Sequence, residues 1–423
     1  MSDDPPRPPE LLMRAYRAML AAADPRAVLP PHLPGRPAGR TVVVGLGKAS
    51  AAMAQAVEAH WDGPLSGVVV VPDGSALPLE RIRVLASSHP VPDARSVQAA
   101  RALLDAVSGL GPDDLVLALV SGGGSALCAL PADGLPLEEK RRLTQALLAS
   151  GASIHEMNTV RRHLSRIKGG RLAAAAWPAR VATLVISDIP GDDPALAASG
   201  PTLGTDASAD DALAVLARHG LDAGTALRPG QGDAVRTADP RLARNSCAVI
   251  ASAWDGLRAA AEVVRAQGLP CHVLGDALES EARDLAQAHA GIVAAILRHG
   301  QPFQGPCVLL SGGEATVTLR GDGRGGRNTE FALALALALE HSGHASKVHL
   351  LSAGTDGLDG RAGAAGAWAG PDTLSRARAA GLAPRRLLER NDSATLFART
   401  GSLVQTGPTH TNINDFRAVL VEP

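Results

Sequence analysis

The sequence has 423 residues, of which 46% are hydrophobic and 20% charged, a composition typical of globular proteins and not of disordered or collagen-like chains. Its formal net charge of −1 provides no general attraction to nucleic acids or anionic membranes. Apolar runs such as Phe331–Leu339 are far shorter than the ~18 residues of a membrane span, and the acidic, proline-rich start resembles no signal peptide. With four widely spaced cysteines, these features favour a cytoplasmic protein that binds neither nucleic acid nor membrane. The length favours two domains.

The first half alternates short apolar runs with segments rich in Ala and Leu, which predicts a parallel sheet with helices on both faces. The predicted strands are Thr41–Leu46, Gly67–Val71, Ile82–Ala86, Leu115–Val120 and Val181–Ser187. The predicted helices are Leu11–Ala23, Ala49–Trp61, Asp93–Val107, Leu137–Ser150, much of Asn158–Ala176, and Ala207–His219. Residues 221–244 carry Gly, Pro and Asp without apolar periodicity, so we place the boundary there and predict domains 1–235 and 236–423.

The second half repeats the alternation and predicts a second α/β domain. The predicted strands are Cys247–Ala251, Cys271–Leu274, Cys307–Leu310, Ala315–Leu319, Val348–Ala353 and Phe416–Val421, and the predicted helices are Ala253–Gln267 and Glu279–His299. Residues 331–340 alternate Phe or Leu with Ala, which is the period of a strand. Because Ala and Leu are strong helix formers and a Gly/Asn-rich start precedes them, we predict a buried helix there.

Five glycine-containing loops each follow a predicted strand: Gly45–Ala49, Ser121–Ser125, Ser187–Asp193, Ser311–Glu314 and Gly354–Gly357. Any one of them could be a simple turn that needs glycine for its backbone angles. Ligands of open α/β sheets bind beyond the carboxyl ends of the strands, so five such loops carrying Lys, Ser, Asp and Glu predict a binding crevice. We expect the active site in a cleft between the two domains.

The loop formed by Ser121, Gly122, Gly123, Gly124 and Ser125 is the strongest candidate for binding phosphate. Three consecutive glycines expose backbone N–H groups, the following helix start adds a positive dipole, and both hydroxyls can donate to phosphate oxygens. The motif GxxxxGK[ST] is absent from the sequence, so this is not a Walker A loop.

Lysine is scarce: of 41 basic residues only Lys48, Lys140, Lys168 and Lys347 are lysines, which leaves 37 arginines. Each lysine therefore indicates a position where a compact ammonium matters. Lys48 meets a glycine turn at a predicted helix start, where it could neutralise a phosphoryl oxygen. Lys168 could bind an anion or cap a helix end.

Carboxylates are concentrated in the Ser187–Asp193 loop, which carries Asp188, Asp192 and Asp193. They could solvate a turn, or they could hold a hard cation and accept a proton from a hydroxyl nucleophile. Asp356 and Asp359 form a second acidic loop. Arg327, beside a predicted helix start, could clamp a carboxylate or phosphate with two N–H groups. His89 and His410 lie in motif-rich loops, and we expect structural roles for both.

These strings together make the sequence resemble the class II glycerate 2-kinases, whose C-terminal part is the MOFRL module. The resemblance covers essentially the whole chain, and its matching strings are Gly45–Ala49, Ser121–Leu127, Asn158–Ser165, Lys168–Leu172, Ser187–Asp193, Ala198–Thr202, Gly312–Glu314, Gly325–Asn328, Gly354–Gly357 and Thr406–Asp415. The resemblance implies phosphorylation of D-glycerate on its 2-hydroxyl by ATP, with Mg²⁺ or another divalent cation, to give 2-phosphoglycerate and ADP. It also implies a Rossmann-like first domain and a second α/β domain that contains MOFRL at about residues 305–415.

Carried over position by position, the resemblance assigns the catalytic lysine, aspartate and arginine to Lys48, Asp188 and Arg327. We expect the Ser121–Ser125 loop, with Thr355 and Asp356, to bind the nucleotide phosphates. We expect Lys168, Arg161 and Asn328 to bind the substrate, and Asp192 and Asp193 to bind the metal. The family often has glycine at the position of His410. A homodimer is an option that the sequence leaves open.

Two other functions compete with the kinase. In an NAD(P)H-dependent hydroxypyruvate reductase, a name that some relatives carry, Gly45-Leu46-Gly47 would bind the cofactor and Asp73 its ribose. The sequence supports this less well, because Ser50 stands where that motif has Gly or Ala and Lys48 occupies the phosphate turn. A nucleotide-binding sensor without enzyme activity fits poorly with several acidic loops.

Overall fold

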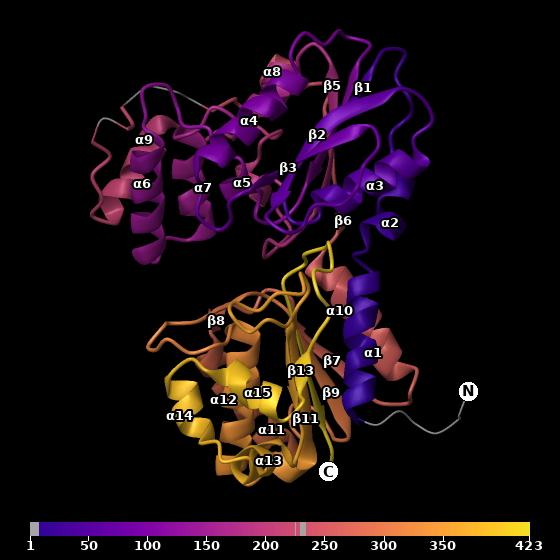
Figure 1. The fold of residues 1–423 in the computed structure, drawn as a ribbon, viewed down its shortest axis with the longest axis vertical. Coiled ribbons are helices and arrows are strands. Elements are labelled where there is room, and N and C mark those ends of the chain that lie inside the picture. The colour runs from indigo at the N-terminus through magenta and orange to yellow at the C-terminus, as the bar shows by residue number, and fades with distance from the viewer. Residues whose placement is uncertain (1–7, 225, 229–233) are drawn as a thin grey trace. The chain divides into compact units, whose positions relative to one another are not determined.

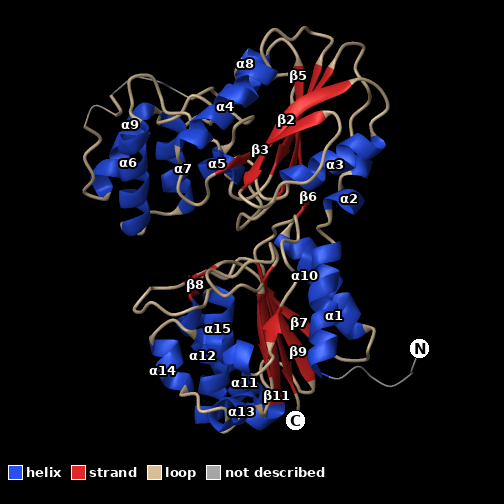
Figure 2. Cartoon of the chain, in the orientation of Figure 1, coloured by secondary structure: helices blue, strands red, loops and turns tan. Residues whose placement is uncertain are grey.

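The computed structural model describes residues 8–224, 226–228 and 234–423, which form two compact units. The first unit spans Pro25–Ile250, and the second combines residues 251–423 with the N-terminal segment that ends at Asp24 (Figure 1). Each unit is a sheet with helices on both faces, as Figure 2 shows by colour, so the predicted α/β fold is confirmed. None of the helices in the described ranges has the length and apolar character that crossing a membrane requires.

The sheet of the first unit has the strand order β3-β2-β1-β4-β5-β6. Its strands are β1 (Thr41–Leu46), β2 (Leu65–Pro72), β3 (Ile82–Ser87), β4 (Leu115–Val120), β5 (Arg180–Ile186) and β6 (Ser246–Ala251). Strands β1 to β5 are parallel to one another. The chain builds outward from β1 to β3 and then returns to place β4 on the other side of β1. This is the Rossmann order, and β1 and β4 flank its topological switch point.

The helices of the first unit are α2 (Pro25–Val28), α3 (Ser50–His60), α4 (Ala94–Ala106), α5 (Gly124–Leu127), α6 (Leu137–Ala149), α7 (Ile154–His163), α8 (Arg171–Ala176) and α9 (Ala209–Arg218). Helices α6, α7 and α9 share a separate apolar core that includes Leu143, Val160 and Leu216. Much of Asn158–Ala176 is helical, as predicted, but α7 and α8 are separated by a non-helical segment. Helix α7 ends at His163, and Gly169 and Gly170 adopt φ angles of 58° and 77°, which no helix accommodates.

The sheet of the second unit has the order β13-β12-β11-β14-β9-β7 and is mixed. Its strands are β7 (Cys271–Gly275), β9 (Cys307–Ser311), β11 (Val348–Gly354), β12 (Gly366–Ala369), β13 (Leu403–Val404) and β14 (Asp415–Val421), and β8 (Ser280–Glu281) pairs separately with β10 (Ala315–Thr316). Strand β14 runs antiparallel to both neighbours, β9 and β11. The carboxyl ends of β7, β9 and β11 therefore lie at the edge where β14 begins.

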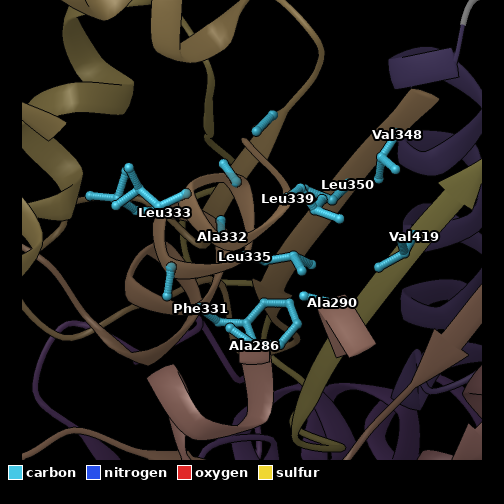
Figure 3. Packing of buried hydrophobic residues seen from close by; sticks show 14 of the residues in the cluster. Ala286, Ala290, Phe331, Ala332, Leu333, Leu335, Leu339, Val348, Leu350 and Val419 are labelled. Atoms are coloured by element: carbon cyan, nitrogen blue, oxygen red, sulfur yellow. The ribbon is translucent and has the colours of Figure 1, made fainter. Parts of the chain in front are cut away.

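The helices of the second unit are α1 (Pro8–Ala21), α10 (Ala253–Arg265), α11 (Ala282–His299), α12 (Arg327–His341), α13 (Thr373–Ala379), α14 (Pro384–Glu389) and α15 (Ser393–Arg399). Helices α1 and α10 cover one face of the sheet, and α11 and α12 cover the other (Figure 2). The predicted buried helix at 331–340 is confirmed as part of α12. Its Phe331, Leu333 and Leu335 pack into the core shown in Figure 3.

The compact units differ from the predicted domains 1–235 and 236–423 at both ends of the first one. The lead-in helix α1 belongs to the second unit, because its Tyr16 and Met19 are fully buried against that unit. Gly256 of α10 makes this packing possible, since a Cβ atom there would lie 2.7 Å from Met19 Cγ. Strand β6, predicted for the second half, joins the sheet of the first unit beside β5.

Several short elements of the second unit were not predicted, namely β8, β12, β13 and the helices α13 to α15. Conversely, the strand predicted for Ala315–Leu319 is only the two-residue β10. His410, at a position where the resembling family often has glycine, adopts a φ of 59°. Glycine has no steric penalty at such an angle, and histidine is one of the side chains that tolerate it.

Candidate active site

The loops after β1 and β4 are joined by hydrogen bonds at the topological switch point of the first sheet. Lys48 donates its backbone N–H to Gly122 O at 2.9 Å, and Ser121 donates its own to Leu46 O at 3.1 Å. The Ser121 hydroxyl accepts the N–H of Ala49 at 3.0 Å and is completely buried. Lys48 and the Ser121–Ser125 loop, which the sequence predicted to act together, therefore lie side by side.

The Ser121–Ser125 loop presents backbone amides. Gly123 has a φ of 82°, and α5 begins at the next residue. Within the described residues, the N–H groups of Gly122 and Gly123 and of the first two residues of α5 have no acceptor. Such a group of amides at a helix start is suited to an anion. Of the two hydroxyls, that of Ser125 bonds to Ser199, and that of Ser121 is completely buried and accepts the N–H of Ala49.

His89 belongs to the same cluster, although the sequence favoured a structural role for it. It follows β3, and its imidazole lies over the glycine loop: a Cβ atom at Gly123 would be 3.0 Å from His89 Nε2 and 3.6 Å from Lys48 Cγ. The positive φ of Gly123 favours glycine there, and a side chain would crowd His89. Its place just after a predicted strand was the signal that could have marked His89.

The three aspartates of the Ser187–Asp193 loop lie at the carboxyl end of β5, the strand next to β4. Asp188 and Asp192 are half-buried, whereas Asp193 is exposed and its Oδ1 accepts the N–H of Ala195 at 2.9 Å. Within the described residues, no three His, Cys, Asp or Glu side chains form a metal-binding group. The aspartate carboxylates of this loop still suit Mg²⁺, because proteins often hold this ion through one or two carboxylates together with substrate phosphates.

Arg161 and Lys168, predicted to bind substrate, lie in different environments. Arg161, on α7, is half-buried, and burial lowers the pKa of its guanidinium. Its guanidinium has no hydrogen-bond or ion-pair partner among the described residues. Lys168 is only 2% exposed and donates to the carbonyls of Ser125 and Cys128, at 2.8 and 3.1 Å. Arg161 is thus suited to an anionic ligand, whereas Lys168 supports the glycine loop from beneath.

In the second unit, Arg327 is held by two carboxylates at the edge where β14 begins. Its Nε donates to both oxygens of Asp415, at 2.8 and 3.0 Å, and its Nη1 lies 2.8 Å from Glu314 Oε1. Burial opposes the charge on Arg327, but Asp415 and Glu314 outweigh it and raise its pKa. Its Nη2 has no acceptor within the described residues, and the side chain is 25% exposed. One face of a fixed, permanently charged guanidinium is therefore left for a ligand.

Asn328 supports Arg327 from inside the protein. Its Nδ2 donates to Asp415 Oδ1 at 2.9 Å, its Oδ1 accepts from Ser352 Oγ at 2.7 Å, and the residue is 1% exposed. Burial would raise the pKa of Asp415, but Arg327 and Arg417 outweigh that effect and lower it. Because its amide is engaged on both sides, Asn328 is better placed to position Arg327 than to contact a substrate.

Thr355 and Asp356, predicted to bind nucleotide, lie where the Gly354–Gly357 loop meets the Thr406–Asp415 loop. The Thr355 hydroxyl donates to Asn414 O at 2.6 Å and accepts the N–H of Ile413 at 2.9 Å, so it joins the two loops. Asp356 is 8% exposed, and its Oδ1 accepts the N–H of Leu358 at 3.0 Å. The neighbouring Asp359 instead binds the amides at the start of α12.

The structure therefore forms two clusters. The first contains Lys48, the Ser121–Ser125 loop and His89, with the Asp188 loop on the same sheet edge. The second contains Arg327, Asn328, Asp415 and the Thr355–Asp356 loop. The location of the active site in a cleft between the domains stays a prediction.

Two family models match the chain. One is described as a domain of unknown function, DUF4147, and matches residues 11–228, about half of the chain. The other is the MOFRL family and matches residues 307–415, in agreement with the predicted extent of that module.

Proteins similar to this chain carry two kinds of name. A protein of Agrobacterium vitis named "Putative hydroxypyruvate reductase" is 50% identical over 97% of this chain and 94% of its own length. The D-glycerate 2-kinase of Thermotoga maritima is 37% identical over 97% and 98% of the two chains. A crystal structure of glycerate kinase from the same organism superposes with a TM-score of 0.85 at 35% identity, covering 97% of this chain and 98% of that one.

Proposed function

Because this chain belongs to the glycerate 2-kinase family that carries the MOFRL module, we propose that it is an ATP-dependent kinase of D-glycerate. The reaction forms a bond between the 2-hydroxyl oxygen and the γ-phosphorus of ATP, breaks the bond from that phosphorus to ADP, and yields 2-phosphoglycerate. The observation that carries this assignment is the joining of the Lys48 turn and the Ser121–Ser125 loop at the switch point of a Rossmann sheet.

Catalysis of phosphoryl transfer consists mostly of positioning the reactants and neutralising charge, and different residues of the site serve these two purposes. The amides of residues 122–125 bind phosphate oxygens, and the ammonium of Lys48 neutralises charge on the transferring group. Asp188 orients the glycerate 2-hydroxyl and accepts its proton. Arg327 and Arg161 are the candidate partners of anions, because each keeps N–H groups without an acceptor among the described residues.

Mg²⁺ is the metal that we propose to accompany ATP. Asp192 and Asp193 would hold it together with the nucleotide phosphates, and their carboxylate oxygens suit this hard cation. When bound, the ion neutralises charge on the phosphate chain. The protein's own residues then need only to orient the hydroxyl and to move its proton.

The test is to incubate the purified protein with D-glycerate, ATP and Mg²⁺ and to identify the product by phosphorus NMR. The proposal expects 2-phosphoglycerate and a matching amount of ADP. Formation of 3-phosphoglycerate would overturn the assignment of the 2-hydroxyl, and the absence of any phosphoglycerate would overturn the kinase.

Hydroxypyruvate reduction is the second candidate, because relatives that are 50% and 52% identical carry that name. Asp73, the residue predicted to bind the ribose of the cofactor, already forms an ion pair: its two carboxylate oxygens accept hydrogen bonds from Arg95, at 2.8 and 3.1 Å. Ser50, at the position where the cofactor motif has Gly or Ala, is buried and donates to Gly47 O. Loss of NADH absorbance on addition of hydroxypyruvate would support the reductase, and a constant absorbance beside active phosphorylation would exclude it.

A further inference from the structure

A chain of hydrogen bonds runs beneath the Ser121–Ser125 loop. Lys168 Nζ donates to Ser125 O at 2.8 Å, to Cys128 O at 3.1 Å and to Ser125 Oγ at 3.3 Å. Ser125 Oγ lies 2.5 Å from Ser199 Oγ, and Ser199 Oγ donates to Asn158 Oδ1 at 2.7 Å. Lys168, Ser199 and Asn158 are each no more than 2% exposed, so water cannot replace these partners.

Asn158, at the end of this chain of hydrogen bonds, fixes which group donates and which accepts in each bond. Asn158 donates from Nδ2 to Leu196 O at 3.3 Å, which leaves Oδ1 to accept the single proton of Ser199. Ser199 must then accept from Ser125, and Ser125 in turn accepts from Lys168. Every group is satisfied only if Lys168 supplies three N–H donors, which is the full complement of an ammonium.

The backbone around the chain is held in a demanding conformation. Ala198 and Ser199 have φ angles of 49° and 65°, uncommon for residues with a side chain. Two main-chain bonds fix this turn, from the N–H of Gly169 to Ser199 O at 3.2 Å and from the N–H of Gly170 to Gly200 O at 2.9 Å. Strain of this kind persists where the surroundings impose it, and here it places Ser199 against Ser125.

On the premise of the proposed kinase, we propose that Lys168 is a positioning residue for phosphoryl transfer. Its ammonium orders the Ser125–Ser199–Asn158 chain and thereby holds the Ser121–Ser125 loop in the form that receives the nucleotide phosphates. Lys168 acts through Ser125 and contacts no substrate, which replaces the role that the sequence suggested for it.

The charge on Lys168 is sensitive to pH. Burial lowers its pKa to about 7, the nearby Cys128 opposes this shift, and Arg161 on α7 adds to it. Lys140 on α6 and Arg171 on α8 are further cations of this region, and Arg171 donates to Lys168 O at 3.0 Å. A neutral amine has only two N–H donors, so deprotonation forces one bond of the chain to reverse or break.

The first experiment compares Lys168→Met with the wild type by steady-state kinetics between pH 6 and 9. In the wild type, kcat/KM for ATP should fall as pH rises through about 7, because this ratio reports ionisations of the free enzyme. In Lys168→Met, kcat/KM should be lower by roughly ten- to a hundredfold at pH 6, as expected for loss of a charged hydrogen bond. The fall of kcat/KM near pH 7 should be absent from Lys168→Met.

The matched control is Lys140→Met. Lys140 is also a buried lysine of the first unit, with its Nζ donating to Leu164 O at 2.6 Å, but it lies outside the chain. Lys140→Met should keep the wild-type kcat/KM at pH 6 and should retain the fall of kcat/KM with rising pH, because the hydrogen-bond chain stays intact. A merely structural effect of removing a buried ammonium would appear in both variants as a lower Tm without any change of profile.

Ser199→Ala provides a second route if Lys168→Met does not fold, because it breaks the chain outside the phosphate loop. It should lower kcat/KM for ATP and flatten the profile near pH 7. The positioning role is overturned if an active wild type and either folded variant share the same kcat/KM and profile. Absence of 2-phosphoglycerate from the wild type would instead overturn the kinase itself, so the two failures are distinguishable.

Discussion

At the scale of single residues, the scarcity of lysine proved informative. Of the four lysines, Lys140 and Lys168 are buried and Lys48 is half-buried, while only Lys347 is exposed. The two buried ammonium groups donate to main-chain carbonyls in spaces where a planar guanidinium would place its donors differently. Composition alone could mark these positions, but it could not separate Lys48 beside the glycine loop from Lys168 beneath it.

Replacing Lys48 tests the charge at the switch point. We expect Lys48→Ala to lower kcat by ~10²–10³, the usual cost of removing one donor that stabilises a transition state. The Tm should stay within a few degrees of the wild type, because the backbone bonds of Lys48 to Gly122 do not depend on its side chain. Lys48→Arg keeps the charge without the compact shape, and a full recovery of kcat in it would contradict a specific need for an ammonium.

Replacing Arg327 tests the second cluster. We expect Arg327→Lys to lose at least ~10² in kcat, because the single nitrogen of lysine cannot take the separate positions from which Arg327 Nε and Nη1 bind Asp415 and Glu314 while Nη2 is left for an anion. Arg324→Lys, at an exposed arginine of the same glycine-rich segment, is the control and should keep wild-type kinetics. Equal activity of the two variants would remove Arg327 from the mechanism.

At the scale of elements, the start of α12 depends on one buried carboxylate. Asp359 accepts the N–H groups of Asn328 and Thr329, both at 2.9 Å, and the Thr329 hydroxyl at 2.8 Å. Asp359→Ala leaves these donors without acceptors, so we expect it to lower the free energy of unfolding by about 1–3 kcal/mol. Denaturant titration of both variants measures this free energy. Asp322→Ala, which removes an exposed partner of Arg390, is the control and should change the free energy of unfolding little.

The effect of Asp359 should depend on pH. Burial outweighs the hydrogen bonds from residues 328 and 329 and raises its pKa from 3.8 to about 6. Between pH 4 and 6 the folded state therefore binds more protons here than the unfolded state does, and this part of the stability is lost as pH rises through 6. The difference in unfolding free energy between wild type and Asp359→Ala should be larger at pH 4 than at pH 7. A constant difference would show that the carboxyl titrates normally.

Most elements of regular structure could be predicted, because apolar runs such as 115–120 are local signals. The glycine loops could also be placed, since each follows such a run. The short elements between 366 and 404 could not, because their burial depends on partners distant in sequence. Ser199 was missed for the same reason, as only the folded chain brings it to Ser125.

At the scale of the whole molecule, the second unit is built from both ends of the chain. Tyr16 of α1 is buried, and its hydroxyl donates to Gly354 O at 2.7 Å, at the start of the loop that carries Thr355 and Asp356. Burial, with the nearby carboxylates Asp356 and Asp415, raises the pKa of Tyr16 well above its usual value, so it stays a donor. Helix α1 is therefore part of the support of the second cluster.

Tyr16→Phe tests this support, because it keeps the ring in the core and removes only the hydroxyl. We expect a loss of about 1 kcal/mol in unfolding free energy and faster amide exchange within residues 354–357. Exchange in the Ser121–Ser125 loop, which belongs to the other unit, should be unchanged. Uniform acceleration in both loops would contradict a local role for the hydroxyl.

The divided second unit also sets an order of events during synthesis. Helix α1 (Pro8–Ala21) is synthesised long before β14 (Asp415–Val421), the strand that pairs with β11 in the sheet of the second unit. At ordinary elongation rates the apolar side of α1 waits roughly 20–80 s for that strand. Pro25–Ile250 can form its own sheet during this interval, while the apolar side of α1 stays uncovered. In the cell, the newborn chain would thus be most vulnerable to aggregation just before β14 emerges from the ribosome.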